Sequence, residues 1–203
     1  SNKTVMSFSK PTKISPLSPQ SPQSAALKRV ARGNLCAGCG GCALVAPDKI
    51  EMVLAPPGFL RPNQITPLNP EEEARIARIC PGLGQDVDPD GRIDDILWGP
   101  YISMHTGFST NPALRHQASS GGALSAVLTH LLDSGDIDAV IQTGAAPQVP
   151  VANVTVLSQS PADVTNAAGS RYAPSAPLAG LEPYLDSSSQ FAFVGKPCDV
   201  VAL

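Results

Sequence analysis

Apolar residues recur with the period of a helix in one stretch of this chain, and they form short continuous runs before and after that stretch. Residues 123–133 are predicted to form an amphipathic helix that ends at Gly135, with its apolar side made by Leu124, Val127, Leu128, Leu131 and Leu132. Strands are expected at residues 102–108, 138–143, 151–157 and 190–194, and a second helix at 177–185. Helices that alternate with such strands predict an α/β domain with an open, largely parallel or mixed sheet.

The residues before this region predict smaller elements. We expect a basic helix at residues 26–31, one helical turn at 43–47, strands at 50–54 and 59–62, and a helix that ends near residue 79. The last helix has clear start signals: Asn69 can cap it, Pro70 suits its first position, and Glu71 to Glu73 complement the positive end of its dipole. The acidic triplet is therefore a helix-start feature, and the helix carries Cys80 at its end.

Three cysteines, Cys36, Cys39 and Cys42, lie in one loop with two residues between each and the next, and these intervening residues are almost all glycine. Thiolates at this spacing reach adjacent irons of a [4Fe–4S] cube, and glycine lets backbone N–H groups turn toward the sulfurs. Cys80, followed by Pro81, offers the fourth ligand. Zinc and a disulfide knot are the alternatives, but zinc sites more often use two separated pairs. The spacing therefore favours an iron–sulfur cluster.

Composition narrows the setting. The chain has 203 residues, a net charge of −3 and five cysteines, an odd number that argues against a closed disulfide framework. The charge predicts no binding of nucleic acid or anionic membrane, and no apolar run approaches the ~20 residues of a membrane span. The polar, proline-rich start does not resemble a secretory signal. Cysteines at metal-type spacing indicate a reducing, cytoplasmic location.

We divide the chain into a disordered Ser/Pro-rich tail (1–25), an iron–sulfur domain (26–85), an acidic linker (86–97) and an α/β domain (98–203). The linker imitates a calcium-binding loop from Asp86 to Asp94. Leu97, however, stands where such a loop needs a bidentate glutamate, which favours a solvated linker. The apolar end at Val200 to Leu203 has no helix-ending signal, so we expect the α/β domain to be incomplete.

Two glycine-containing stretches are candidate ligand sites. Ser119-Ser120-Gly121-Gly122 leads into the helix at 123–133, where free N–H groups and the dipole favour a phosphate that Arg115 could pair with. The alternative is a capped helix with a small-residue packing contact. Gly169-Ser170-Arg171-Tyr172 is a glycine turn followed by a cation and by an aromatic ring that could stack on a flat ring system. The same packing alternative applies there.

Cys198 follows a predicted strand and stands at a helix start, where the pKa of a thiol tends to fall. Three roles remain open for it from the residues alone. It could bind a second cluster, act as a redox-active thiol, or be a buried structural residue.

Several motifs in fixed order carry a family resemblance. They are Cys36-x-x-Cys39-x-x-Cys42, Cys80-Pro81-Gly82, Gly99-Pro100-Tyr101, the block from Arg115 to Val140, Gly169-Ser170-Arg171-Tyr172 and Val194-Gly195-Lys196-Pro197-Cys198. Together they resemble the family of beta subunits of coenzyme F420-reducing hydrogenases and dehydrogenases. That family includes 7-hydroxymethyl chlorophyll a reductase and a ferredoxin-dependent 8-vinyl reductase. The likeness covers about residues 30–203 and corresponds to the N-terminal part of the family.

The resemblance implies an oxidoreductase with FAD and one or two [4Fe–4S] clusters. Electrons would pass between ferredoxin, or another redox subunit, and a small organic hydride acceptor such as F420 or a tetrapyrrole. The implied metal ligands are Cys36, Cys39, Cys42 and Cys80, with Cys198 as a further candidate. The implied flavin contacts are Arg115, Ser119, Ser120, Gly121, Gly122, Gly169, Ser170, Arg171, Tyr172, Gly195 and Lys196.

The resemblance assigns no general acid or base, and a homo-oligomer is possible. The alternatives are an electron-transfer subunit without substrate chemistry and a zinc-stabilised binding module.

Overall fold

The structure, a computed structural model, describes residues 23–203. The predicted tail at 1–25 therefore lies outside the described residues except for its last three. Of these, Ser24 is buried and caps the first helix by accepting a hydrogen bond from the Leu27 N–H.

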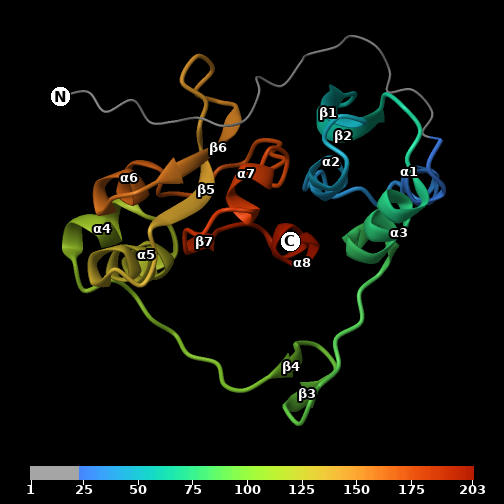
Figure 1. Ribbon diagram of the computed structural model, residues 1–203. Coiled ribbons are helices and arrows are strands. Elements are labelled where there is room, and N and C mark those ends of the chain that lie inside the picture. Colours follow the sequence, from blue (N-terminus) through green and yellow to red (C-terminus); the bar gives the residue numbers. More distant parts are fainter. Residues whose placement is uncertain (1–22) are drawn as a thin grey trace.

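The described chain contains helices and short strands (Figure 1). In chain order they are α1 (Ala25–Arg32), α2 (Gly41–Val45), β1 (Ile50–Ala55), β2 (Phe59–Gln64), α3 (Pro70–Ile79), the 3-10 turn η1 (Pro81–Leu83), β3 (Ile93–Asp95), β4 (Gly99–Tyr101), α4 (Pro112–Gln117), the 3-10 turn η2 (Ser120–Gly122), α5 (Ala123–Ser134), β5 (Ala139–Ala145), β6 (Asn153–Ser158), α6 (Pro161–Asn166), α7 (Glu182–Leu185), β7 (Phe191–Phe193) and α8 (Pro197–Ala202).

Residues 23–83 form an N-terminal module around the antiparallel pair β1 and β2. Helices α1, α2 and α3 pack beside this hairpin, and Ile50 and Ile76 are buried in the shared core. The buried side chain of Gln64, at the end of β2, accepts hydrogen bonds from the Gln23 and Ser24 N–H groups and so holds the start of α1 to the hairpin.

Helix α3 begins as its sequence predicts. The Asn69 side chain accepts a hydrogen bond from the Glu72 N–H at 2.8 Å, and the Glu72 carboxylate accepts one from the Asn69 N–H at 2.7 Å. This reciprocal pair is a capping box. The Lys49 ammonium also donates a hydrogen bond to the Glu72 carboxylate, at 2.8 Å. This bond and the one from the Asn69 N–H hold the pKa of Glu72 below its usual range.

The larger α/β part contains a three-stranded mixed sheet in the order β6-β5-β7. Strand β5 pairs with β6 antiparallel and with β7 parallel. Its side chains alternate between two cores: Val140 packs with Leu128 of α5, whereas Ile141 packs with Leu178 and Leu181. Because both faces of β5 are covered, the strand is apolar throughout its first half. The expectation of a mixed α/β fold is confirmed.

Three predicted elements differ in the structure. Residues 102–108 form no strand, because no strand lies beside them among the described residues, and Ile102 is 80% exposed. The predicted linker at 86–97 contains β3, which pairs with β4. Of the helix expected at 177–185 only α7 forms, because Gly180 takes a φ of +85° and Pro183 follows it.

The β3–β4 hairpin stands apart from the rest of the chain (Figure 1). Large apolar side chains on and beside it are exposed, including Ile96, Leu97 and Trp98. Within residues 23–203, no helix combines the length and the apolar character that crossing a membrane requires.

We expect Asn69→Ala to lower the free energy of unfolding by about 1 kcal/mol, because it removes the side chain that caps α3. Chemical denaturation at neutral pH measures this change. Asn166→Ala, in the last turn of α6, serves as the control, since Asn166 caps no helix start. An equal loss in both variants would contradict the role given to the capping box.

The stabilisation by Glu72 should depend on pH. Its folded-state pKa lies below that of the unfolded chain, so its contribution is present at neutral pH and disappears as the pH falls through the folded-state pKa. Glu72→Gln should therefore be less stable than the parent protein at neutral pH, and the difference should vanish in acid. Denaturation curves across this range test it, and a difference that grows in acid would contradict it.

Candidate functional site

The cysteine loop, residues 36–42, takes its shape from two glycines with left-handed backbones. Gly38 has a φ of +76° and Gly40 a φ of +86°. A Cβ atom on Gly40 would lie 2.8 Å from the Ala179 backbone nitrogen, so a side chain is excluded there by space as well as by conformation. The Leu178 N–H donates a hydrogen bond to the Cys39 carbonyl at 3.1 Å. The loop therefore lies directly on residues 176–179 of the α/β part.

Four of the five cysteines meet at one pocket. Cys36, Cys39 and Cys42 come from the cysteine loop, and Cys80 comes from the end of α3, as predicted from the capped helix. We call this the thiol pocket. No group of three or more His, Cys, Asp or Glu side chains within residues 23–203 is arranged to hold a metal ion. The thiols are all free and partly buried.

The electrostatics of the thiol pocket show that its sulfurs affect one another. Burial, partly offset by the Gly41 N–H and reinforced by Asp199 and the neighbouring cysteines, raises the pKa of Cys39 to about 11. Burial and then repulsion from Cys39, Cys36 and Cys80 hold the pKa of Cys42 well above its usual range. The thiols of Cys39 and Cys42 therefore favour the protonated form when no counter-charge is present. A bound cation would reverse this balance and release their protons.

The thiol pocket contains the type and number of donors that an iron–sulfur cluster takes, although they are not arranged around a metal position in this structure. The Gly41 N–H lies 3.5 Å from the Cys39 sulfur, where it can stabilise a thiolate. The thiol pocket has a volume of about 30 Å³.

Cys198 lies outside the thiol pocket. It is in the first turn of α8, as predicted, with its sulfur 3.8 Å from a carboxylate oxygen of Asp199. Burial and then the Asp199 charge raise the pKa of the Cys198 thiol. This shift runs against the lowering that its place at a helix start predicts.

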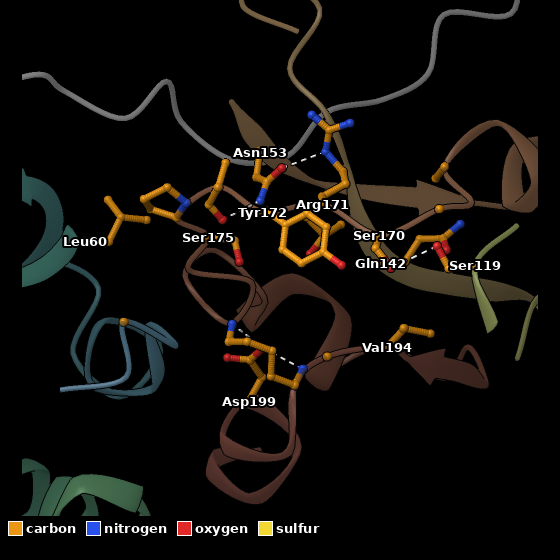
Figure 2. Close-up of a pocket in the computed structure, with 18 of the residues that line it drawn as sticks. Leu60, Ser119, Gln142, Asn153, Ser170, Arg171, Tyr172, Ser175, Val194 and Asp199 are labelled. Carbon is orange, nitrogen blue, oxygen red and sulfur yellow. Dashed lines mark hydrogen bonds and ion pairs between the residues drawn. The ribbon is translucent and has the colours of Figure 1, made fainter. Parts of the chain in front are cut away.

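A second cavity of about 740 Å³ lies between the two parts of the protein, and we call it the central cavity (Figure 2). Phe59, Leu60 and Arg61 of β2 line one side, and the sheet and its loops line the other. The carboxyl end of β7 leads into it through Val194 and Gly195, and β5 contributes Gln142 and Thr143. In open α/β sheets, ligands bind at this end of the parallel strands. The volume is that of a cofactor site.

Tyr172 occupies the middle of the view of the central cavity, and its ring is directed inward (Figure 2). The side chain is 97% exposed, so its flat face is open to a ligand. Beside it, the Ser170 hydroxyl donates a hydrogen bond to the Ser119 hydroxyl at 2.8 Å. This contact joins two sequence motifs that lie 51 residues apart.

Arg171, by contrast, points away from the central cavity (Figure 2). Its Nε donates to the Asn153 side-chain oxygen at 2.7 Å, and one terminal nitrogen donates to the carbonyls of Pro150 and Ala152. Asn153 in turn donates to the Ala173 carbonyl at 2.7 Å. Arg171 therefore ties the start of β6 to the loop that carries Tyr172, and most of its donors are used.

An ion pair with a buried carboxylate and a half-exposed ammonium borders the central cavity. Asp199 is only 1% exposed and accepts hydrogen bonds from the backbone N–H and the ammonium of Lys196, both at 2.8 Å. The Lys196 side chain is half exposed. Gly195 is required here because a Cβ atom would lie 2.7 Å from that of Asp199. The carboxylate thus fixes a cation at the cavity wall.

The structure brings together eight of the eleven predicted flavin contacts. Those that line the central cavity are Ser119, Ser120, Gly169, Ser170, Arg171, Tyr172, Gly195 and Lys196. Arg115, Gly121 and Gly122 do not line it. The Arg115 guanidinium stacks on Phe108 at 4.0 Å from the ring centre, in a separate surface pocket. A Cβ atom on Gly121 would lie 2.9 Å from Phe108, so this glycine serves packing.

Other polar residues of the central cavity were not predicted, among them Gln142, Asn153 and Asp199. Gln142 and Asn153 lie in strands, where a single polar residue carries little signal. Asp199 could have been predicted as a capping residue. An acid at the third position of a helix commonly accepts a hydrogen bond from the backbone N–H of the N-cap residue.

The fold and the site together define a small cysteine-rich module that packs against a mixed α/β domain with a cofactor-sized cavity. Comparison with known proteins agrees with this class. Residues 104–182 match the family described as coenzyme F420 hydrogenase/dehydrogenase, beta subunit N-term. The chain is also 24% identical over 176 residues to one of the subunits of the F(420)H(2) dehydrogenase of Methanosarcina mazei.

That alignment covers 87% of this chain and 49% of the relative, so the chain spans about half the length of the curated relative. With the family match, it confirms the resemblance inferred from the motifs. Both matches point to the N-terminal part of the beta subunits of coenzyme F420 hydrogenases and dehydrogenases as what this chain is similar to.

Gly40→Ala should weaken the contact between the cysteine loop and residues 176–179. Gly135→Ala is the matched control, because Gly135 also has a positive φ, of +76°, but has open space around its Cβ position. The control should lose about 1 kcal/mol of unfolding free energy from backbone strain alone. Gly40→Ala should lose clearly more in the same denaturation measurement. Equal losses would show that the loop does not depend on this close approach.

Proposed function

We propose that the protein is an iron–sulfur flavoprotein oxidoreductase. In this proposal the thiol pocket holds a [4Fe–4S] cluster and the central cavity holds FAD. Electrons pass between a one-electron carrier, such as ferredoxin or a partner redox subunit, and an organic hydride donor or acceptor. The relative is named as part of an F(420)H(2) dehydrogenase, and this supports a deazaflavin of the F420 type as that organic substrate.

One observation carries the proposal: the thiol pocket and the central cavity share a wall. Ala37 lines both, and Gly38 lines the central cavity from the middle of the cysteine loop. On the far side, Asp199 lines the cavity while Ala202, one helical turn later, lines the thiol pocket. Electron tunnelling weakens steeply with distance. Two redox groups in these adjoining spaces would therefore exchange electrons efficiently.

The residues of the central cavity suit a flavin. The open face of Tyr172 can stack on a flat ring system, and the hydroxyls of Ser119, Ser120 and Ser170 can donate hydrogen bonds to phosphate or ribityl oxygens. The first turn of α5 borders the cavity through Leu124 and Ser125, so the positive end of its dipole faces an anionic ligand. A bound flavin would accept two electrons as a hydride and release them one at a time.

Lys196 and Asp199 have a positioning role in this proposal. Asp199 orients the Lys196 ammonium at the cavity wall through two hydrogen bonds. A cation held there stabilises negative charge on a neighbouring ligand without having to reorganise during the reaction. Leu60, Leu124 and Leu128 contribute apolar surface elsewhere on the cavity lining.

The cluster is tested by two cysteine variants of protein purified and analysed without oxygen. Cys80→Ser removes a thiol of the thiol pocket and should lose most of the iron and acid-labile sulfide. Cys198→Ser should retain both, because this thiol lies outside the pocket. Loss of iron in Cys198→Ser alone would contradict the assignment. Zinc without acid-labile sulfide in the parent protein would also overturn it.

The flavin site is tested by Tyr172→Ala, with Tyr172→Phe as the matched control. Loss of ring stacking worth about 1 kcal/mol should weaken FAD binding about fivefold, and the phenylalanine variant should bind nearly as the parent does. Quenching of flavin fluorescence during titration of the flavin-depleted protein measures the affinity. Equal affinity in all three proteins would place the flavin elsewhere.

A further inference from the structure

The exposed sides of α1 and α3 carry five cations without an ion-pair partner. They are Lys28, Arg29, Arg32, Arg75 and Arg78, and we call this set the basic face. The ion pairs found among residues 23–203 join Lys49 to Glu72 and Lys196 to Asp199, and neither involves this set. The charges of the basic face are therefore free to act on a partner.

The basic face lies on the outside of the wall that encloses the thiol pocket. Helix α1 turns Leu27 and Val30 inward to line that pocket, while its cations point to solvent. Helix α1 contacts α3 and also contacts η1, the turn after Cys80. Arg78 lies in the last turn of α3, two residues before Cys80. Arg78 therefore lies near the thiols, and the other four cations lie on exposed positions of the same two helices.

The acids of α3 do not cancel these charges. Glu71, Glu72 and Glu73 all lie in the first turn, at the opposite end of the helix from Cys80. Glu72 is bound to Lys49, and Glu73 accepts a hydrogen bond from the Ala26 N–H at 2.8 Å. Helix α3 is therefore acidic where it begins and basic where it approaches the thiol pocket.

Helix stabilisation accounts for only some of the cations. Arg29, Arg32 and Arg78 lie in last turns, where a positive charge complements the helix dipole. Lys28 and Arg75 lie outside the last turns and gain nothing from that effect. The charge also differs between the two parts that the structure describes: residues 23–83 hold seven Lys and Arg against five Asp and Glu, whereas residues 84–203 hold four against twelve.

We propose that the basic face is the docking surface for an acidic one-electron carrier protein. The inference rests on the proposed function, because a carrier docks usefully only where a redox group is near. A negatively charged carrier is steered toward the cations and repelled by the acidic α/β part, residues 84–203. None of the five cations lines the central cavity, so the carrier and the organic substrate would use different residues.

The test uses an acidic bacterial-type ferredoxin as the probe and measures its association with the immobilised protein. Arg32→Gln/Arg75→Gln removes one cation from each helix, and glutamine keeps good helix propensity. The matched control is Ser188→Asp/Ser189→Asp, which lowers the net charge equally at two exposed positions of the α/β part. At low ionic strength the association rate should fall about tenfold for the first variant and stay within about twofold of the parent for the control. Salt should remove the difference.

Two outcomes would overturn the proposal. Equal rates in the parent and Arg32→Gln/Arg75→Gln would show that the basic face does not guide the carrier. An equal fall in the control would show that net charge alone sets the rate. The iron and sulfide content of the same preparations separates this proposal from the proposed function. A loaded cluster with an unaffected association rate rejects only the docking surface, whereas a protein without iron rejects the redox function itself.

Discussion

The approach of the cysteine loop to residues 176–179 is the contact on which the site depends. The Leu178 N–H donates to the Cys39 carbonyl, and Gly40 leaves room for the Ala179 backbone. A buried cluster forms around this contact, in which Leu178 and Leu181 pack with Ala202 of α8 and with the partly buried Cys39 and Leu44. The same few atoms therefore shape the thiol pocket, close the central cavity and join the two parts of the chain.

Helix α8 makes the second connection between these spaces. It begins at Pro197, its buried Asp199 lies against the central cavity, and its buried Ala202 lies 3.3 Å from the Cβ position of Gly41. Six residues thus span the distance from a cofactor-sized cavity to the thiols. A substitution in α8 that altered its packing would move both spaces at once, which explains why small side chains occupy its contact with the cysteine loop.

Local signals predicted more of the fold than long-range ones did. Asn69, Pro70 and Glu72 specify the start of α3 through atoms three residues apart, and this is the element predicted most completely. The strand predicted from the apolar character of residues 102–108 does not form, because an apolar run becomes a strand only where another strand pairs with it. The thiol set could be predicted because metal ligands repeat at short spacing. The gathering of Ser119, Ser170 and Lys196 around one cavity could be inferred only from the family resemblance, since no local pattern links them.

The most direct test of a redox pair across the shared wall is the visible absorption of the protein purified without oxygen, before and after dithionite. The account predicts a structured flavin band over a broad sulfide-to-iron background, with both bleached on reduction. A broad background without a flavin band would leave the thiol pocket assigned and would reject the flavin in the central cavity. A colourless protein in repeated anaerobic preparations would contradict the account as a whole.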